Sequence, residues 1–164
     1  VNWLVNTKGI PPKSLGIYGQ SLGALTALTT SQHTNDFSAI AVHDPPVNFE
    51  TLVREEMVYQ GFPGFLFEPT SHYARVFEGI SLTLITPETS LTRSDKQPIL
   101  IFNGMLDERI LPHHSLDLVE LADSLGIETE LYRYEDVGHV GSLWAYTDEF
   151  ERLIVQFFNE NLAS

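Results

Sequence analysis

The stretch from residue 17 to residue 25 constrains the fold of this chain more than any other. Its sequence, Ile-Tyr-Gly-Gln-Ser-Leu-Gly-Ala-Leu, sets Ser21 between Gly19 and Gly23. The preceding run, Ser14–Tyr18, is suited to a buried strand, and the residues after the serine have the apolar spacing of a helix. A chain that passes so quickly from strand to helix turns sharply at the serine. We therefore expect a side chain at either flanking glycine to clash.

The same pattern indicates a reactive serine. At such a turn the hydroxyl of Ser21 projects above the end of the sheet, as in the Gly-x-Ser-x-Gly arrangement formed by Gly19, Gln20 and Gly23 around it. The following helix directs its first amides and its positive dipole end at the same point, which suits a developing oxyanion. Five-residue patterns also arise by chance in glycine-rich turns, so the strand and helix on either side carry much of the interpretation.

Composition excludes several classes of function. The 164 residues are 43% hydrophobic, which is enough for one domain with a substantial core. A formal net charge of −13 would repel phosphate backbones and anionic lipids, so we expect no nucleic-acid or membrane partner. The absence of cysteine excludes disulfides, thiolate metal sites and a cysteine nucleophile. No apolar run approaches the roughly 20 residues of a membrane span.

Apolar runs that alternate with amphipathic helices predict an α/β fold with a parallel sheet of about four strands flanked by helices. The predicted strands are Ser14–Tyr18, Ala39–Val42, Pro98–Phe102 and Glu128–Tyr134. The last of these alternates apolar and polar residues, which is typical of a strand nearer the edge of a sheet.

The pattern weakens between Phe49 and Gln97, where we expect a less regular excursion above the sheet. Five aromatic residues gather there: Phe62, Phe65, Phe67, Tyr73 and Phe77. We expect most of them to form a small local core, with one or two lining a pocket.

A serine nucleophile needs a base to accept its proton and an acid to orient that base. Ser21 follows the first predicted strand, Asp107 follows the third and His139 follows the fourth. The carboxyl ends of parallel strands meet at one edge of a sheet, so these side chains are expected to gather there. The chain order serine, aspartate, histidine is the order found in α/β-hydrolases.

Other residues compete for the acid and base roles. Asp44 also follows a strand and is the second candidate for the acid. Pro45 and Pro46 directly after it are typical of a turn, which ranks it below Asp107. Glu108 adjoins Asp107 and is expected to point elsewhere. The remaining histidines lack a glycine-framed loop after a late strand, and the pair at positions 113 and 114 is expected to be solvated or capping. They are His33, His43, His72, His113 and His114.

Three segments carry a family resemblance: Ile17–Gly23, Asn103–Ile110 and Gly138–His139. They resemble the motif blocks of α/β-hydrolases, and the chain is most similar to the catalytic domain of the prolyl oligopeptidase family of serine peptidases. In that family an Asp-x-Arg-Val segment follows a strand that ends in glycine, and Asp107-Glu108-Arg109-Ile110 is similar. A further similarity lies in Phe37–Val47, which follows the predicted helix.

The resemblance implies a role for each of these residues. Ser21 would be the nucleophile, Asp107 the orienting acid and His139 the base, while the Leu22 amide would donate to the oxyanion. It also implies hydrolysis of a peptide or ester through an acyl-enzyme, with no cofactor and no metal.

Two departures from the family pattern keep alternatives open. The family commonly has Gly-Gly where this chain has Gly23-Ala24, which favours a carboxylesterase-like hydrolase as the alternative. Residues 1–164 are expected to be the C-terminal portion of a catalytic domain, without the loop that donates the second oxyanion contact. A non-catalytic, hydrolase-like binding module is therefore the third possibility. The expected partner is the N-terminal part of the same fold, or a second copy along the Ser14–Tyr18 edge.

Overall fold

One parallel sheet organises the computed structural model, which describes residues 1–31, 33–34, 36–79 and 86–162. Its strands are β1 (Gly16–Gln20), β2 (Ala39–His43), β3 (Ile99–Gly104) and β4 (Thr129–Tyr134). They pair side by side in the order β1-β2-β3-β4, and every pair is parallel. The predicted α/β sheet is confirmed, with strand ends that shift by one or two residues.

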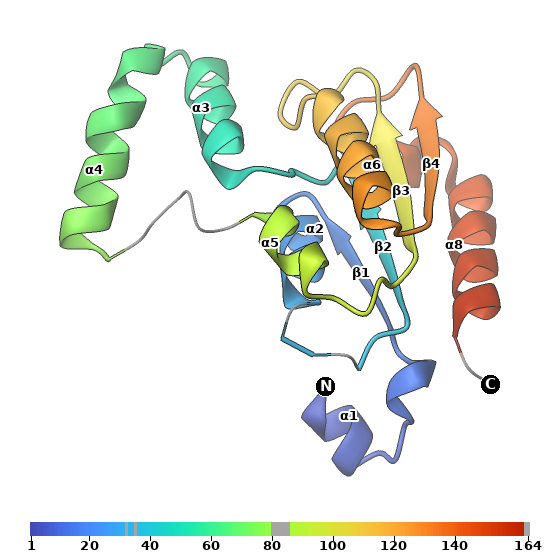
Figure 1. The fold of residues 1–164 in the computed structure, drawn as a ribbon. Helices are drawn as coiled ribbons and strands as arrows, with labels where there is room; N and C mark the ends of the chain where they lie inside the picture. The colour runs from blue at the N-terminus through green and yellow to red at the C-terminus, as the bar shows by residue number, and fades with distance from the viewer. Residues whose placement is uncertain (32, 35, 80–85, 163–164) are drawn as a thin grey trace.

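Helices cover both faces of this sheet and also extend away from it (Figure 1). The α-helices are α1 (Asn2–Asn6), α2 (Leu22–Thr30), α3 (Phe49–Tyr59), α4 (Phe67–Phe77), α5 (Pro87–Thr92), α6 (His113–Leu125), α7 (Ser142–Ala145) and α8 (Thr147–Asn161). Short 3-10 turns lie at Pro12–Ser14 and Gly64–Leu66. Within the described ranges, no helix has the length and apolar character needed to cross a membrane.

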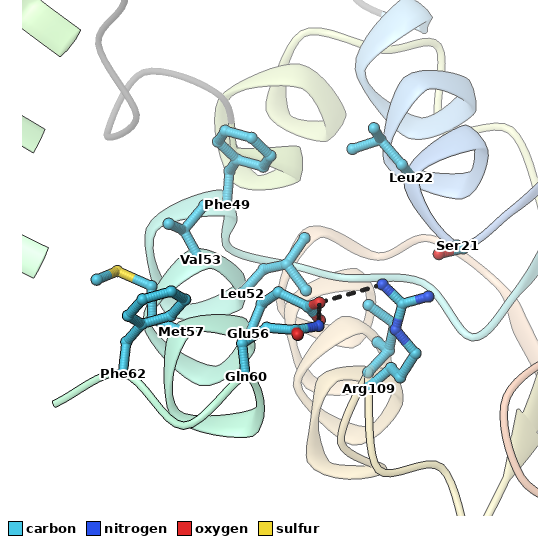
Figure 2. A pocket seen from close by; sticks show the side chains of 11 residues that line it. Ser21, Leu22, Phe49, Leu52, Val53, Glu56, Met57, Gln60, Phe62 and Arg109 are labelled. Atoms are coloured by element: carbon cyan, nitrogen blue, oxygen red, sulfur yellow. Dashed lines mark hydrogen bonds and ion pairs between the residues drawn. The ribbon is translucent and has the colours of Figure 1, made fainter. Parts of the chain in front are cut away.

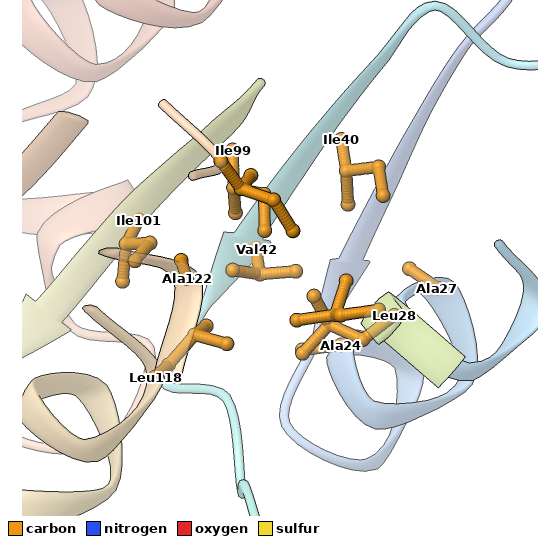
Figure 3. Close-up of a cluster of buried hydrophobic side chains, with 11 residues drawn as sticks. Ala24, Ala27, Leu28, Ile40, Val42, Ile99, Ile101, Leu118 and Ala122 are labelled. Atoms are coloured by element: carbon orange, nitrogen blue, oxygen red, sulfur yellow. The ribbon is translucent and has the colours of Figure 1, made fainter. Parts of the chain in front are cut away.

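The core forms two layers because β2 and β3 are buried on both faces. On one face, isoleucine and valine side chains of these strands pack against α2, α5 and α6 (Figure 3). On the other face, Ala41, Leu100 and Phe102 pack against Phe150 and Phe157 of α8. Covered faces on both sides explain why the two strand sequences are continuous apolar runs rather than alternating ones.

The first strand is less buried than its apolar run indicates, because it forms the sheet edge that was expected at Ser14–Tyr18. β1 lies at one edge of the sheet, and its burial changes from residue to residue, with Tyr18 37% exposed. β4 forms the opposite edge, as its alternating sequence indicated.

The aromatic residues of the excursion do not form the predicted local core. Phe67 is buried, and the guanidinium of Arg54 lies 3.7 Å from the centre of its ring. The other four aromatic side chains are between 55% and 75% exposed, since α4 contacts α3 and the turn before it rather than the sheet. They are Phe62, Phe65, Tyr73 and Phe77.

The free edge of β1 leads to a proposal about association. We propose that this edge pairs with a further strand, from the rest of its own fold or from a second copy of the chain, because an uncovered strand edge attracts pairing. Sedimentation velocity of the isolated chain should show self-association that weakens with dilution. A monomer that melts cooperatively at all concentrations would contradict the proposal.

Candidate active site

Ser21 occupies a strained turn between β1 and α2. Its φ is 53° and its ψ is −124°, a conformation that non-glycine residues rarely adopt. A Cβ atom at Gly19 would collide with the backbone carbonyl of Gly23, so the close approach of strand and helix requires glycine at position 19. At Gly23 a Cβ would meet no atom within 4 Å beyond its chain neighbours and the nearby backbone of α2, so the expected clash there is wrong. Gly23 contributes through its backbone position.

The backbone around the serine suits an oxyanion. Leu22 is the first residue of α2, and the first amides of a helix have no partner within it. The amide of Ser21 itself donates to the carbonyl of His43 at 2.9 Å, which holds the turn against β2. Gln20 ends β1, and its side-chain amide donates to the hydroxyl of Tyr18 at 2.6 Å. The oxyanion role of Leu22 stays a prediction.

Asp107 and His139 form a close pair. His139 Nδ1 lies 2.7 Å from Asp107 Oδ2. The other carboxylate oxygen accepts the backbone amides of Arg109 at 2.8 Å and Ile110 at 3.0 Å, and the side chain of Asp107 is fully buried. A carboxylate only accepts, so Nδ1 of His139 carries the proton and Nε2 is left to act as a base. The hydrogen bond to Asp107 raises the pKa of His139 above its ordinary value.

The hydroxyl of Ser21 does not take part in the hydrogen bond between Asp107 and His139. In the part of the chain that the structure describes, no hydrogen bond joins the hydroxyl of Ser21 to His139. Such contacts are often long without substrate and tighten in the reacting complex. The assignment of Ser21 as nucleophile and His139 as its base therefore stays a prediction.

Asp44, the competing acid, has a different set of partners. One carboxylate oxygen accepts the Gly104 amide at 2.9 Å and the side-chain amide of Asn103 at 3.2 Å, and the other accepts the Val140 amide at 2.6 Å. The residue is fully buried, and burial raises its pKa. Because Asp107 makes the hydrogen bond to the ring of His139, Asp107 is the better candidate for the orienting acid.

A second serine–histidine–aspartate group lies beneath the site. Ser142 Oγ is 2.9 Å from Nε2 of His43, and Oδ2 of Asp44 is 3.7 Å from the same nitrogen. Both partners approach one nitrogen, whereas a proton relay uses Nδ1 for the acid and Nε2 for the serine. All three residues are fully buried, and burial lowers the pKa of His43 to about 4, so this histidine is a neutral core residue.

His113 and His114 connect α6 to α3. Their Nε2 atoms lie 2.8 Å and 2.9 Å from the two carboxylate oxygens of Glu55. His114 is 1% exposed, so the expectation that it is solvated is wrong. Burial lowers the pKa of His114, whereas hydrogen bonds to Asp117 and Glu55 outweigh burial and raise the pKa of His113.

Two groups of described residues have the composition of metal ligands: Glu55 with His113 and His114, and Asp44 with Asp107 and His139. In the first group, His114 Nδ1 accepts the Val47 amide at 3.3 Å, so its proton lies on Nε2, which faces Glu55. In the second, the proton of His139 lies toward Asp107. In each group, a histidine nitrogen that faces a carboxylate carries a proton, whereas a metal ligand must offer a lone pair at that nitrogen.

An apolar pocket of about 350 Å³ opens beside Ser21 (Figure 2). Side chains of α3 form one wall, while the serine and Leu22 stand on the other side. Its lining comprises Ser21, Leu22, Phe49, Leu52, Val53, Glu56, Met57, Gln60, Phe62, Arg109 and Ile110. An ion pair between Arg109 and Glu56, 3.2 Å apart, spans it. Phe62 thus lines a pocket, as expected for one or two of the aromatic residues.

Most of the residues in this wall were not expected to line a pocket. Phe49, Leu52, Val53 and Met57 recur at helical spacing in α3, which indicates one apolar face. That spacing predicts a covered face without saying what covers it. Here part of the face is open to the pocket beside the serine.

Solved structures similar to this one include both esterases and peptidases. An esterase of Pyrococcus furiosus matches with 20% identity and a TM-score of 0.70, over 99% of this chain and 59% of its own. The acylaminoacyl peptidase of Pyrococcus horikoshii matches with 16% identity and a TM-score of 0.77, over 98% of this chain and 26% of its own. A puromycin-hydrolyzing peptidase of Mycobacterium tuberculosis matches with 17% identity and a TM-score of 0.75, over 97% and 24%.

These likenesses establish the α/β-hydrolase fold, and this chain spans between 24% and 59% of the length of the three structures. A comparison with curated proteins found no match. The model of the prolyl oligopeptidase family matches residues 1–164, the whole of the sequence. The chain therefore belongs to the prolyl oligopeptidase family.

Proposed function

We propose that the protein is a serine hydrolase, most consistent with a peptidase of the prolyl oligopeptidase type, in which Ser21, Asp107 and His139 form the catalytic triad. The observation that carries the proposal is the 2.7 Å contact between His139 and the buried Asp107, at the sheet edge where Ser21 forms its strained turn. Family membership supports the same assignment.

In the proposed mechanism, Nε2 of His139 removes the proton of the Ser21 hydroxyl as its oxygen attacks the substrate carbonyl. The Leu22 amide donates to the resulting oxyanion, and Asp107 stabilises the imidazolium. The imidazolium then protonates the leaving amine or alcohol, which leaves an acyl-enzyme on Ser21. Water, deprotonated by His139, releases the acid and regenerates the hydroxyl.

The pocket beside Ser21 suggests the acyl group. Its lining is predominantly apolar, and its volume of about 350 Å³ suits a bulky apolar side chain next to the scissile carbonyl. We propose that such a side chain enters between α3 and the serine.

Two alternatives rest on particular observations. A carboxylesterase-like activity is favoured by Ala24, which follows Gly23 where the family commonly has a second glycine, and by the likeness to an esterase. A non-catalytic binding module is favoured by the lack, among the described residues, of a hydrogen bond between Ser21 and His139.

A fluorophosphonate probe should label the complete protein at Ser21, because the probe reacts with serines that a base activates. The Ser21→Ala variant should lose the label, as read by mass spectrometry of the labelled peptide. Ser124→Ala, at an exposed serine of α6, is the matched control and should label as the parent does. Label that persists in Ser21→Ala would reject Ser21 as the nucleophile.

The Asp107→Asn variant should lower kcat by about 10⁴-fold, as loss of the orienting acid does in serine triads. The base works in its neutral form, and the bond to Asp107 raises the pKa of His139. Weakening that bond lowers this pKa, so the acid limb of kcat/KM against pH should move to lower pH. Asp117→Asn, which changes an exposed carboxylate, should leave both quantities unchanged. An Asp107→Asn enzyme with normal kcat would exclude Asp107 as the acid.

Filling the pocket should change acyl preference. In Val53→Trp the larger side chain occupies the cavity, and kcat/KM for esters and anilides of a bulky apolar acyl group should fall roughly tenfold or more. The acetyl derivatives should be hardly affected. Val58→Trp changes an exposed valine of the same helix outside this pocket and serves as control. Equal losses for both acyl sizes would count against the pocket as the acyl site, and the ratio of anilide to ester turnover separates peptidase from esterase.

A further inference from the structure

Backbone strain gathers at the edge of the sheet that carries the site. Within the described ranges, four non-glycine residues have positive φ, and three of them are Ser21, Asp44 and Val140. Ser21 follows β1, Asp44 follows β2 and Val140 adjoins His139 in the loop after β4. Valine is among the residues that tolerate positive φ least, so its φ of 54° requires support from its surroundings.

The Asp44 carboxylate supplies that support. Its Oδ2 accepts the Val140 amide at 2.6 Å, while Oδ1 accepts the Gly104 amide at 2.9 Å. The first bond reaches the loop of the candidate base, and the second reaches the end of β3, just before the loop that carries Asp107. The side chain of Asp44, directly after β2, thus joins the loop of the candidate base to the end of β3, which leads into the loop of the candidate acid.

Burial makes these bonds depend on a carboxylate. Asp44 is 0% exposed, so water does not replace a lost partner. Its two oxygens accept three N–H groups, from Val140, Gly104 and the side chain of Asn103. An amide at position 44 has one oxygen and would turn its NH₂ group toward one of these donors, which leaves a buried N–H without an acceptor.

We propose that Asp44 is a positioning residue for the candidate base: through the Val140 amide it holds the His139 loop in register with Asp107 and Ser21. The inference rests on the proposed function, because it gives His139 the role of the base. Asp44 acts through the backbone next to His139, in contrast to Asp107, which contacts the ring.

The charged groups around His139 include Asp44, so the loss of Asp44 should have a measurable effect on the pKa of His139. One ligand atom each from Asp44, Asp107 and His139 lies within 4.8 Å of the others. The hydrogen bond to Asp107 raises the pKa of His139 most, the charge of Asp44 adds to it, and Arg109 opposes it. His43, which is neutral in the core, and Glu56 across the pocket also interact with His139.

The test compares Asp44→Asn with Asp136→Asn in the complete protein. Asp136 lies in the same loop, is exposed and accepts a hydrogen bond from the hydroxyl of Tyr146, so it offers an equal change of charge without a contact to Val140. In Asp44→Asn, kcat for an ester should fall roughly tenfold to a hundredfold, as expected for a misplaced base, with KM within about twofold. Asp136→Asn should match the parent.

The pH profile separates positioning from general damage to the core. The Asp44 charge, which lies within 4.8 Å of a ring nitrogen of His139, raises the pKa of His139, so its loss should lower that pKa and move the acid limb of kcat/KM to lower pH. A variant that is only partly folded loses activity at every pH and keeps the limb in place. That result, or an unchanged kcat, would overturn the proposal.

An NMR measurement tests the same contact without relying on activity or on a folded variant. In the parent protein the Val140 amide proton should be shifted strongly downfield and protected from exchange, and the His139 imidazole should titrate above free histidine. An amide that exchanges as fast as those of exposed turns would overturn the proposal. Failure of Ser21 to react with the fluorophosphonate, with the Val140 amide protected, would instead reject the proposed function and leave the loop-holding contact established.

Discussion

The close approach of the loops after β3 and β4 is the constraint on which the candidate site depends. A Cβ at Gly104 would lie 2.6 Å from the carbonyl oxygen of Gly138, so these backbones can meet only where position 104 lacks a side chain. Their approach is fixed by the Leu106 amide, which donates to Val137 at 2.9 Å. With the backbones this close, Asp107 and His139 come within hydrogen-bonding distance from segments about thirty residues apart in the sequence.

The parallel sheet and the acid–base pair could be predicted from the sequence because both follow from local patterns. Continuous apolar runs determine β2 and β3, and polar residues directly after strands reach the same sheet edge. The apolar run at β1 alone indicates a buried strand, and its exposure follows instead from the edge position that was expected for it. The burial of His114 was missed, since it arises from Glu55, a partner 59 residues away. The role of Asp44 depends likewise on a donor 96 residues along the chain.

Different interactions hold the two sides of the site. The side that holds Asp107 and His139 is fixed by buried and partly buried hydrogen bonds between strand ends and loops, where water competes less. The pocket side stands on α3, which is joined to the rest of the chain by partly exposed contacts, Glu55 with His114 and Glu56 with Arg109. The Glu56–Arg109 ion pair is partly exposed, so it contributes less and is screened by salt, and α3 is held less firmly than the strand ends.

Under the proposed function, this division separates the residues of the reaction from those that select the acyl group. A substitution on α3 alters the wall of the pocket without touching the hydrogen bonds of Asp107 or Asp44, because none of those bonds comes from α3. A substitution at the strand ends disturbs a close-packed and strained backbone. The same frame can therefore keep one reaction while its pocket changes. Such independence is consistent with finding esterases and peptidases among the structures that share this fold.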